Sequence, residues 1–369
     1  MEKLDIGWRS ALLFSLYLPM ILLVIKLLFK STEKSASKAL AGFVFFFSLT
    51  TIPQIIGFMN AYEIWPGLTF APFNLELLLG PFLLLHVHFL TSQKSTGSIK
   101  LLFIPGFIQF IYYVFVFTYF DDYRDKWQYN EQFHQPYIIH FEVLFISIIS
   151  LYCGYQCWIK IKTYQLFLSD TQSNTESFDP KWLKYFLFAF FSLVLIWLGF
   201  ELSKLIIAPI NYVSQYPIHL LMSLLVLWMA QEGLCHLYEH FPKPDAEANS
   251  IELSNNDQDW GTLVQKIIKT VNKNELYLQP KLTVSQLAKI LGTNDSYISR
   301  ALNENLQMNF NTFINKERIN HAKKCIRSEA DSSLLDIALK AGFSSKSTFN
   351  RMFKQFEGQT PSQFKNITH

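Results

Sequence analysis

Five basic or polar side chains stand within nine residues near the C-terminal end of this 369-residue sequence: Lys346, Ser347, Asn350, Arg351 and Lys354. Between them, apolar residues recur at the i, i+3, i+4, i+7 spacing of one helix face: Phe349, Met352, Phe353 and Phe356. Guanidinium, ammonium, amide and hydroxyl groups are the side-chain groups that bind DNA phosphates and base edges. One interpretation is a merely solvated helix face. The short helix and turn that precede it, ending at Gly342, instead favour a helix-turn-helix motif.

A second set of the same kind lies upstream, at Ser296, Ser299, Arg300 and Asn303. The apolar residues of that stretch would face inward: Ile298, Ala301 and Leu302. We therefore expect two helix-turn-helix motifs, at about 283–304 and 333–356, joined by a helix at about 310–327. That helix would be roughly 27 Å long, close to the ~34 Å between successive major-groove faces of DNA. The second helix of each motif is the recognition helix, here called the reading helix. One chain can thus place both reading helices in neighbouring groove segments.

The stretch from Ile337 to Phe364 carries a long spaced pattern, which includes Gly342-Phe343, Phe349-Asn350-Arg351, Phe353-Lys354 and Thr360-Pro361. On these residues it closely resembles the DNA-binding domain of the AraC/XylS family of bacterial transcription regulators. The segments TVSQLAKILGTNDSYISRALNE and NFNTFINKERINHAK resemble the first motif and the linker helix of that family, so the resemblance covers about 276–365. It implies binding to double-stranded promoter DNA, and a structural role for the arginine of the linker helix, Arg318.

The sequence departs from the family pattern at three positions of the first motif. Gln307 stands where the family usually has glycine. Leu302 and Asn303 replace an aromatic residue and a lysine in the first reading helix. The resemblance therefore implies a reshaped connection after this helix and a smaller share of the DNA affinity for it.

Charge and apolar residues are unevenly divided along the chain. From Lys281 to the end, 13 residues are basic and 7 are acidic, an excess that suits a polyanionic partner. Most of the 35 Phe, 17 Tyr and 8 Trp come before residue 242, which makes that part too apolar for a soluble surface. The polar, proline-bearing stretch 241–258 predicts a flexible linker. The four cysteines form no disulfide or metal-binding pattern, and no metal or cofactor is expected.

Seven stretches before residue 240 are long and apolar enough to cross a lipid bilayer, which takes about 20 residues each. They lie near 10–29, 39–59, 68–90, 100–119, 137–159, 183–206 and 217–234. Seven crossings put the two termini on opposite sides. Ten of the fifteen flanking lysines and arginines fall on the side of the C-terminus, as the positive-inside rule requires. We expect a multi-pass protein of the bacterial cytoplasmic membrane, with the N-terminus outside and the C-terminal domain in the cytoplasm.

Polar and ionisable residues gather toward the outer ends of the expected spans: Asn74, Glu76, His140, Glu142, Glu201, Lys204 and His219. Such groups are costly inside a bilayer and usually face a cavity or one another. One hypothesis is an outward-opening pocket that binds an unidentified signal ligand. The alternative is a set of interfacial residues, in which Glu201 and Lys204 are simple i, i+3 partners.

Residues 236–240 read H-x-x-E-H, a pattern that also occurs in zinc peptidases. Here it stands at the end of the last expected span, just before Pro242 and with no domain to shelter a catalytic metal. We interpret it as the interfacial end of a helix, and we expect no enzymatic activity.

The sequence thus predicts an all-α chain with a seven-helix transmembrane bundle at 1–240, a linker at 241–258 and an AraC-type domain at 259–369. The favoured hypothesis is a membrane-embedded one-component transcription regulator. A homodimer fits this hypothesis, because two tethered DNA-binding domains gain effective concentration. The alternative is a polytopic transporter or membrane enzyme that carries a regulatory DNA-binding tail.

Overall fold

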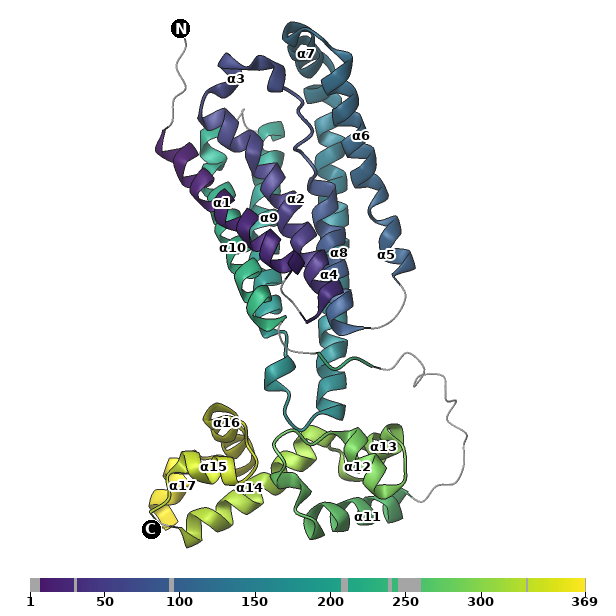
Figure 1. The fold of residues 1–369 in the computed structure, drawn as a ribbon, viewed down its shortest axis with the longest axis vertical. Helices are drawn as coiled ribbons and strands as arrows, with labels where there is room; N and C mark the ends of the chain where they lie inside the picture. The colour runs from purple at the N-terminus through teal and green to yellow at the C-terminus, as the bar shows by residue number, and fades with distance from the viewer. Residues whose placement is uncertain are drawn as a thin grey trace. The chain divides into compact units, whose positions relative to one another are not determined.

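The computed structural model describes residues 7–29, 32–92, 96–206, 212–237, 241–244, 260–329 and 331–368. In these ranges the elements are helices joined by turns and loops, with a single isolated bridge between Gln172 and Thr283 as the strand-like feature (Figure 1). The all-α class is therefore confirmed. The chain divides into two compact units: residues 1–162 with 180–246, and residues 163–179 with 247–369. Most of the expected linker, 245–258, lies outside the described residues.

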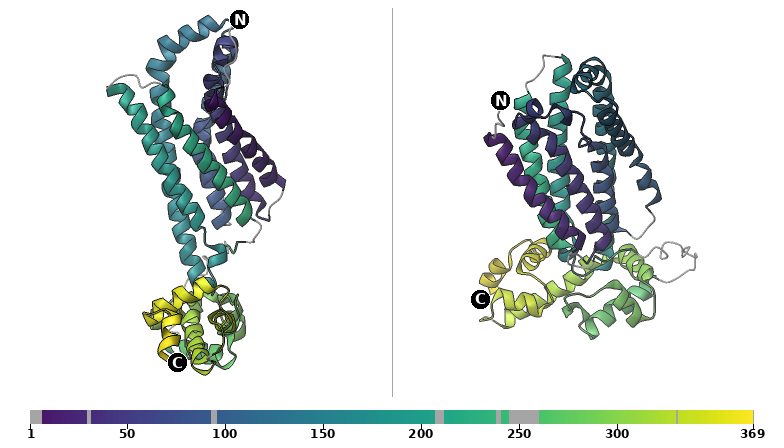
Figure 2. Two further views of the ribbon diagram at one scale, coloured as in Figure 1. Left: turned by 90° about the vertical axis from the view of Figure 1, so that its left-hand side faces the viewer. Right: turned by 45° about the horizontal axis from the view of Figure 1, so that its top comes forward.

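The first unit contains long apolar helices that run side by side (Figure 2). The longer ones are α1 (Trp8–Phe29), α2 (Lys34–Phe58), α4 (Leu79–Thr91), α6 (Ile104–Tyr119), α8 (Ile139–Thr171), α9 (Lys181–Ile206) and α10 (Tyr216–His236). The shorter ones are α3 (Ala61–Ile64), η1 (Pro66–Leu68), η2 (Glu76–Leu78), α5 (Gly97–Leu101), α7 (Tyr123–Tyr129), a π-helix (Asn130–Ile138) and η5 (Tyr212–Gln215). In the described part of the chain, six helices are long and apolar enough to cross a membrane.

The third expected span, 68–90, is shorter than predicted. Helix begins only at η2 and continues through α4, so the apolar helical segment runs from Glu76 to Thr91. At 1.5 Å per residue it is about 24 Å long, less than the ~30 Å of a hydrocarbon core. Pro72 accounts for part of the difference, because proline and the residue before it disfavour the helix interior.

Contacts between helix ends show that the chain reverses direction from helix to helix. At one end of the unit, Tyr216 packs its ring edge against Trp8 and Phe58, with centroids 5.4 and 5.1 Å away. At the other end, the backbone N–H of Thr32 donates to the carbonyl oxygen of Leu237 over 3.0 Å. The chain therefore enters this unit at one end, in α1, and leaves it at the opposite end, after α10.

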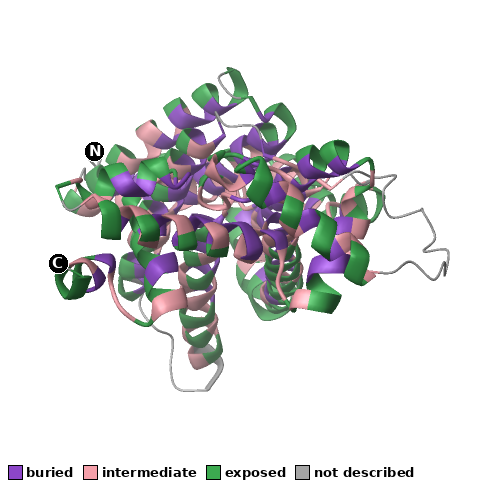
Figure 3. Ribbon diagram, turned by 90° about the horizontal axis from the view of Figure 1, so that it is seen from below, coloured by how far each residue is buried: buried purple, intermediate pink, exposed green. Residues whose placement is uncertain are grey.

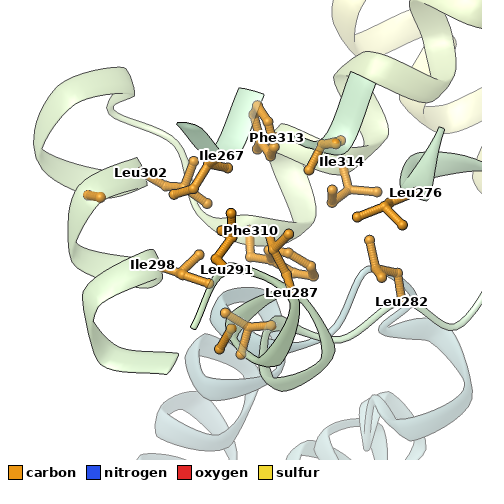
Figure 4. Packing of buried hydrophobic residues seen from close by; sticks show 14 of the residues in the cluster. Ile267, Leu276, Leu282, Leu287, Leu291, Ile298, Leu302, Phe310, Phe313 and Ile314 are labelled. Atoms are coloured by element: carbon orange, nitrogen blue, oxygen red, sulfur yellow. The ribbon is translucent and has the colours of Figure 1, made fainter. Parts of the chain in front are cut away.

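The second unit builds two hydrophobic cores around one shared helix. Its helices are α11 (Trp260–Lys273), η7 (Leu276–Leu278), α12 (Val284–Leu291), α13 (Asp295–Leu306), α14 (Phe310–Ser328), α15 (Leu334–Lys340), α16 (Lys346–Glu357) and α17 (Pro361–Thr368), with η4 (Glu176–Phe178) from the earlier segment. Phe310, Phe313 and Ile314 of α14 join the first core, which Figure 4 shows from close by. Further along α14, Ile319 and Ala322 join the second core. The helix is thus a spacer that belongs to both motifs.

Each helix of the two motifs begins at a side-chain cap. Thr283 and Gln286 form the complete capping box that their spacing predicts. The other caps are hydrogen bonds from a backbone N–H to the side-chain oxygen of Asn294, Asn309, Ser333 and Ser345. These caps fix where the reading helices start, and hence which residues face outward.

Candidate DNA-binding surface and first-unit cavity

The outer face of α16 carries the polar residues that the sequence singles out. Lys346, Ser347, Asn350, Arg351 and Lys354 are all exposed. On the opposite face, Phe349, Met352 and Phe353 are buried in the second core. Exposed and buried residues occupy different sides of the helices (Figure 3). Helix α16 therefore presents one continuous polar surface to a partner.

The first reading helix, α13, has a less open surface. Ser296 and Asn303 are exposed, whereas Ser299 and Arg300 are half-buried. The guanidinium of Arg300 lies 4.9 Å from the ring centroid of Trp260. Its Nε also donates to Glu304, one helical turn on, over 2.6 Å. Arg300 therefore has two partners within the domain, the ring of Trp260 and the carboxylate of Glu304.

Arg318 lies at the joint between the two motifs and is almost fully buried. Its Nε and Nη2 donate to the backbone carbonyl oxygens of Tyr277 and Gln279, each over 2.7 Å. The guanidinium also stands over the ring of Phe343, 5.7 Å from its centroid. Burial lowers the pKa of Arg318 to about 10. This agrees with the structural role that the family resemblance implies.

The first unit contains a partly open cavity of about 430 Å³. It brings together five of the seven residues proposed for a signal pocket: Asn74, Glu76, Glu142, Glu201 and His219. The sixth, His140, is exposed and is not among the lining residues. The side chain of the seventh, Lys204, lies outside the described residues.

Hydrogen bonds connect the polar lining of this cavity. The hydroxyl of Tyr113 donates to Glu142 over 3.0 Å, and Asn74 Nδ2 lies 3.4 Å from the same hydroxyl. The amide Nε2 of Gln109 lies 3.5 Å from a carboxylate oxygen of both Glu76 and Glu142. Sequence reasoning missed Gln109 and Tyr113, although both are polar groups in a strongly apolar helix, which is the signal that could have found them.

The second unit contains two pairs of helices joined by short turns, α12–α13 and α15–α16, which is the arrangement of a helix-turn-helix motif. A family model described as "Helix-turn-helix domain" matches residues 287–367, and this part of the chain is a domain of the AraC type. The family expectation is thereby confirmed for the C-terminal domain.

Two transcription regulators and one solved structure each match less than a third of this chain. An uncharacterised helix-turn-helix-type transcriptional regulator of Staphylococcus aureus (strain COL) is 37% identical over 100 residues, which are 27% of this chain and 13% of that protein. The melibiose operon regulatory protein of Escherichia coli (strain K12) is 33% identical over 87 residues, 24% of this chain and 28% of its own. A solved structure of a protein of unknown function from Listeria innocua is 22% identical, with a TM-score of 0.27, and covers 29% of this chain and 98% of that one. The chain thus spans less than a third of the length of either regulator.

Proposed function

We propose that this protein is a membrane-embedded, one-component transcription regulator that binds promoter DNA through α13 and α16. The main support for the proposal is the exposed polar face of α16. This face points outward because the phenylalanines on the opposite face are buried in the core. Helix α14 spaces the two reading helices, and at 1.5 Å per residue its length is about 28 Å. This is close to the distance between successive major-groove faces. The basic excess of the domain supports a phosphate-bearing partner.

The test compares a reading residue with a matched control. Genomic DNA crosslinked to the intact protein in living cells supplies the duplexes, and the purified full-length protein in lipid nanodiscs is titrated with them. Arg351→Ala is expected to weaken binding by about 1–3 kcal/mol, or roughly 5- to 150-fold. Lys324→Ala, which removes one exposed charge from α14, should change affinity less than twofold. Equal affinities for wild type and Arg351→Ala would refute the role given to α16.

The location proposed is the bacterial cytoplasmic membrane, with the C-terminal domain in the cytoplasm. Six apolar helices of sufficient length support membrane insertion. The reversal of direction along the first unit supports termini on opposite sides. A fluorescent protein that matures only in the cytosol, fused after His369, should be bright. A periplasmic phosphatase at the same position should be inactive, and the opposite pattern would refute this topology.

The cavity of the first unit is our proposed signal site. Five predicted residues line it, and its volume matches a small molecule. Carboxylates there accept hydrogen bonds from the neutral groups of Gln109 and Tyr113. A ligand with cationic or hydrogen-bond-donating groups would complement them. His140 is no longer part of this proposal, because it is exposed.

Ligand binding is testable without knowing the natural signal. A panel of small amines and polyols is screened for stabilisation of the full-length protein in nanodiscs, since a ligand that binds only the folded state raises the melting temperature. Glu142→Gln should abolish a shift that the panel reveals, and Glu63→Gln, at an exposed residue, should keep it. A shift that survives in Glu142→Gln would place the ligand elsewhere. Substrate uptake by vesicles that contain the protein would favour the transporter alternative.

Homodimerisation is part of the proposed mechanism. A ligand that favours one arrangement of two bundles would change how two tethered domains fit paired sites. Mass photometry of the protein in native nanodiscs measures the state directly. Protein that is monomeric with and without ligand, and that still regulates, would exclude this version.

A further inference from the structure

The segment between α8 and α9 belongs to the same compact unit as the DNA-binding domain. Residues 163–179 group with residues 247–369, although α8 and α9 are helices of the first unit over most of their length. We call residues 172–178 the connector. Its contacts with the DNA-binding domain join positions 109 (Ser173 and Leu282) to 175 (Glu176 and Arg351) residues apart in the chain. The connector is thus a part of the domain's tertiary structure.

One half of the connector is fixed to the first motif and to α14. Gln172 forms an antiparallel bridge with Thr283, and the N–H of Ser173 donates to Leu282 over 3.0 Å. Asn311 Nδ2 donates to the carbonyl oxygens of Gln172 and Ser173 over 3.1 and 2.9 Å.

The buried side chain of Arg318 adds two more hydrogen bonds between the domain and this half of the connector. Its Nη1 donates to the carbonyl oxygen of Ser173 over 3.3 Å, and its Nη2 to the hydroxyl over 3.2 Å. Ser173 is 2% exposed, so these bonds are shielded from water. The contacts of Gln172 and Ser173 therefore form a defined docking site and not a loose surface contact.

The other half of the connector reaches the start of the second reading helix. Asn174 Nδ2 donates to the hydroxyl of Ser344 over 2.8 Å. The hydroxyl of Ser345, the N-cap of α16, donates to Glu176 over 2.9 Å. Arg351 Nη2 lies 3.5 Å from the other oxygen of the Glu176 carboxylate. The carboxylate therefore lies against the N-terminal end of α16 and against its exposed arginine.

Glu176 occupies a position that suits a DNA phosphate. The N-terminal end of a helix attracts anions, and an arginine beside it adds a donor and a positive charge. Phosphates bind helix N-termini, arginine and serine hydroxyls at protein–DNA interfaces. A glutamate carboxylate presents the same negative charge and the same acceptor oxygens. On the first reading helix, the hydroxyl of Ser299 likewise donates a hydrogen bond to the carbonyl oxygen of Asp170 over 3.4 Å.

We propose that the connector is an internal docking partner of the DNA-binding domain, and that it competes with DNA for the recognition surface of α16. This inference rests on the proposed DNA-binding function. In the docked state the Glu176 carboxylate accepts the hydrogen bond of Ser345 and pairs with Arg351. A duplex can bind these two side chains only after Glu176 has moved away. The apparent affinity for DNA is therefore reduced by the fraction of molecules in which the connector is docked.

The same covalent path gives the cavity a way to control docking. Helix α8 carries Glu142, which lines the cavity, and continues to Thr171, directly before the connector. Helix α9 begins at Lys181, after the connector, and carries Glu201, which lines the same cavity. A ligand that shifts α8 relative to α9 changes the geometry of the segment that joins them. It thereby shifts the balance between docked and released states.

The first experiment weakens docking and measures DNA affinity in the full-length protein in nanodiscs. The probe is a duplex selected from a random-sequence library by the Glu176→Gln protein. Glu176→Gln removes the anion, and Asn174→Ala removes the bond to Ser344 without a change of charge. Both should bind the duplex about three- to tenfold more tightly than wild type, the factor expected for loss of a partly exposed ion pair and its hydrogen bonds. Asp121→Asn removes one exposed charge from the first unit and should match wild type.

The second experiment locks the docked state. Asn174→Cys with Ser344→Cys, in a background where the native cysteines are serine, places two thiols where the side chains are now hydrogen-bonded. Oxidation should form the disulfide and reduce DNA affinity at least tenfold, and a reductant should restore it. Each single cysteine variant is the control. An excess of duplex should slow disulfide formation, because DNA and the connector exclude one another.

The outcomes separate this inference from the proposed function. If no duplex is enriched by the Glu176→Gln protein, DNA binding itself is refuted. If a duplex is enriched but wild type, Glu176→Gln and Asn174→Ala bind it within twofold of one another, the competition is refuted and DNA binding stands. A crosslinked protein that binds the duplex with unchanged affinity overturns the competition as well.

Discussion

Arg318 donates a hydrogen bond from Nε to the backbone carbonyl oxygen of Tyr277 across 2.7 Å, which joins the spacer helix α14 to the short helix η7. This bond lies between the two cores, where α14 passes from the first to the second. The distance between the reading helices depends on α14. Under the proposed function, the groups that fix this joint therefore control whether both helices fit one duplex.

Replacing Arg318 with methionine is therefore expected to loosen the joint. Methionine preserves much of the volume, but the carbonyl oxygens of Tyr277 and Gln279 lose their buried donor. Each unsatisfied buried acceptor costs about 1–3 kcal/mol, so the two together are expected to cost about 2–6 kcal/mol. Hydrogen–deuterium exchange of peptides from η7 and α14 in the full-length protein measures it. Lys316→Met, at an exposed position of the same helix, should change exchange by less than about 0.5 kcal/mol.

Gly342→Ala tests the close approach of the two motifs. Gly342 has φ +86°, and a Cβ there would lie 2.7 Å from the carbonyl oxygens of Tyr277 and Leu278. Strain at positive φ and this backbone clash together are expected to cost about 3 kcal/mol or more. Gly358 is the matched control: its φ is +71°, and nothing lies within 4 Å of the added Cβ. Gly358→Ala should cost only about 1 kcal/mol in the same exchange measurement. Equal losses would show that the contact with η7 does not matter.

Gln307→Gly is expected to stabilise the domain. Gln307 ends α13 at φ +53°, in the left-handed region that favours glycine. Glutamine at this position therefore costs backbone strain that glycine would not. Relief of that strain, less the entropy that glycine adds to the unfolded chain, should yield about 0.5–1 kcal/mol. The slowest-exchanging amides of α13 report the change. Gln355→Gly, in the interior of α16, should have the opposite sign, because glycine weakens a helix by about 1 kcal/mol.

Local patterns predicted the DNA-binding domain well and the first unit less completely. The capping box at Thr283 and the buried positions of α16 follow from spacing of three and four residues, which short-range physics controls. For the third span, apolar composition alone predicts too long a helix, because Pro72 interrupts it. The π-helix at Asn130–Ile138 leaves no comparable local signal.

The connector could not be predicted from sequence patterns. Its bonds to Ser344, Ser345 and Arg351 join residues 169 to 175 positions apart. In the sequence, Asn174 and Glu176 are indistinguishable from ordinary polar loop residues. Only the tertiary structure shows that they meet the N-terminal end of a reading helix.

The last prediction concerns the segment that leaves the first unit after α10. The buried carboxylate of Glu33 accepts a hydrogen bond from the N–H of Phe241 over 3.2 Å and pairs with Lys243. The Phe241 side chain is 1% exposed. These contacts fasten the chain to the turn between α1 and α2 before it continues toward the DNA-binding domain. Glu33→Ala removes the hydrogen bond to Phe241 and the ion pair with Lys243 at once, and should release residues 241–243.

Limited proteolysis of the full-length protein in nanodiscs measures this release. With proteinase K, the Glu33→Ala protein should be cut around residue 241 at least threefold faster than wild type, because cleavage tracks the population of locally opened chain. Glu33→Gln retains an acceptor for the N–H of Phe241 and loses only the ion pair, so an intermediate rate is expected. Glu63→Ala removes an exposed carboxylate from α3 and should be cut at the wild-type rate. Wild-type cleavage of Glu33→Ala would mean that burial of Phe241 alone holds this segment in place.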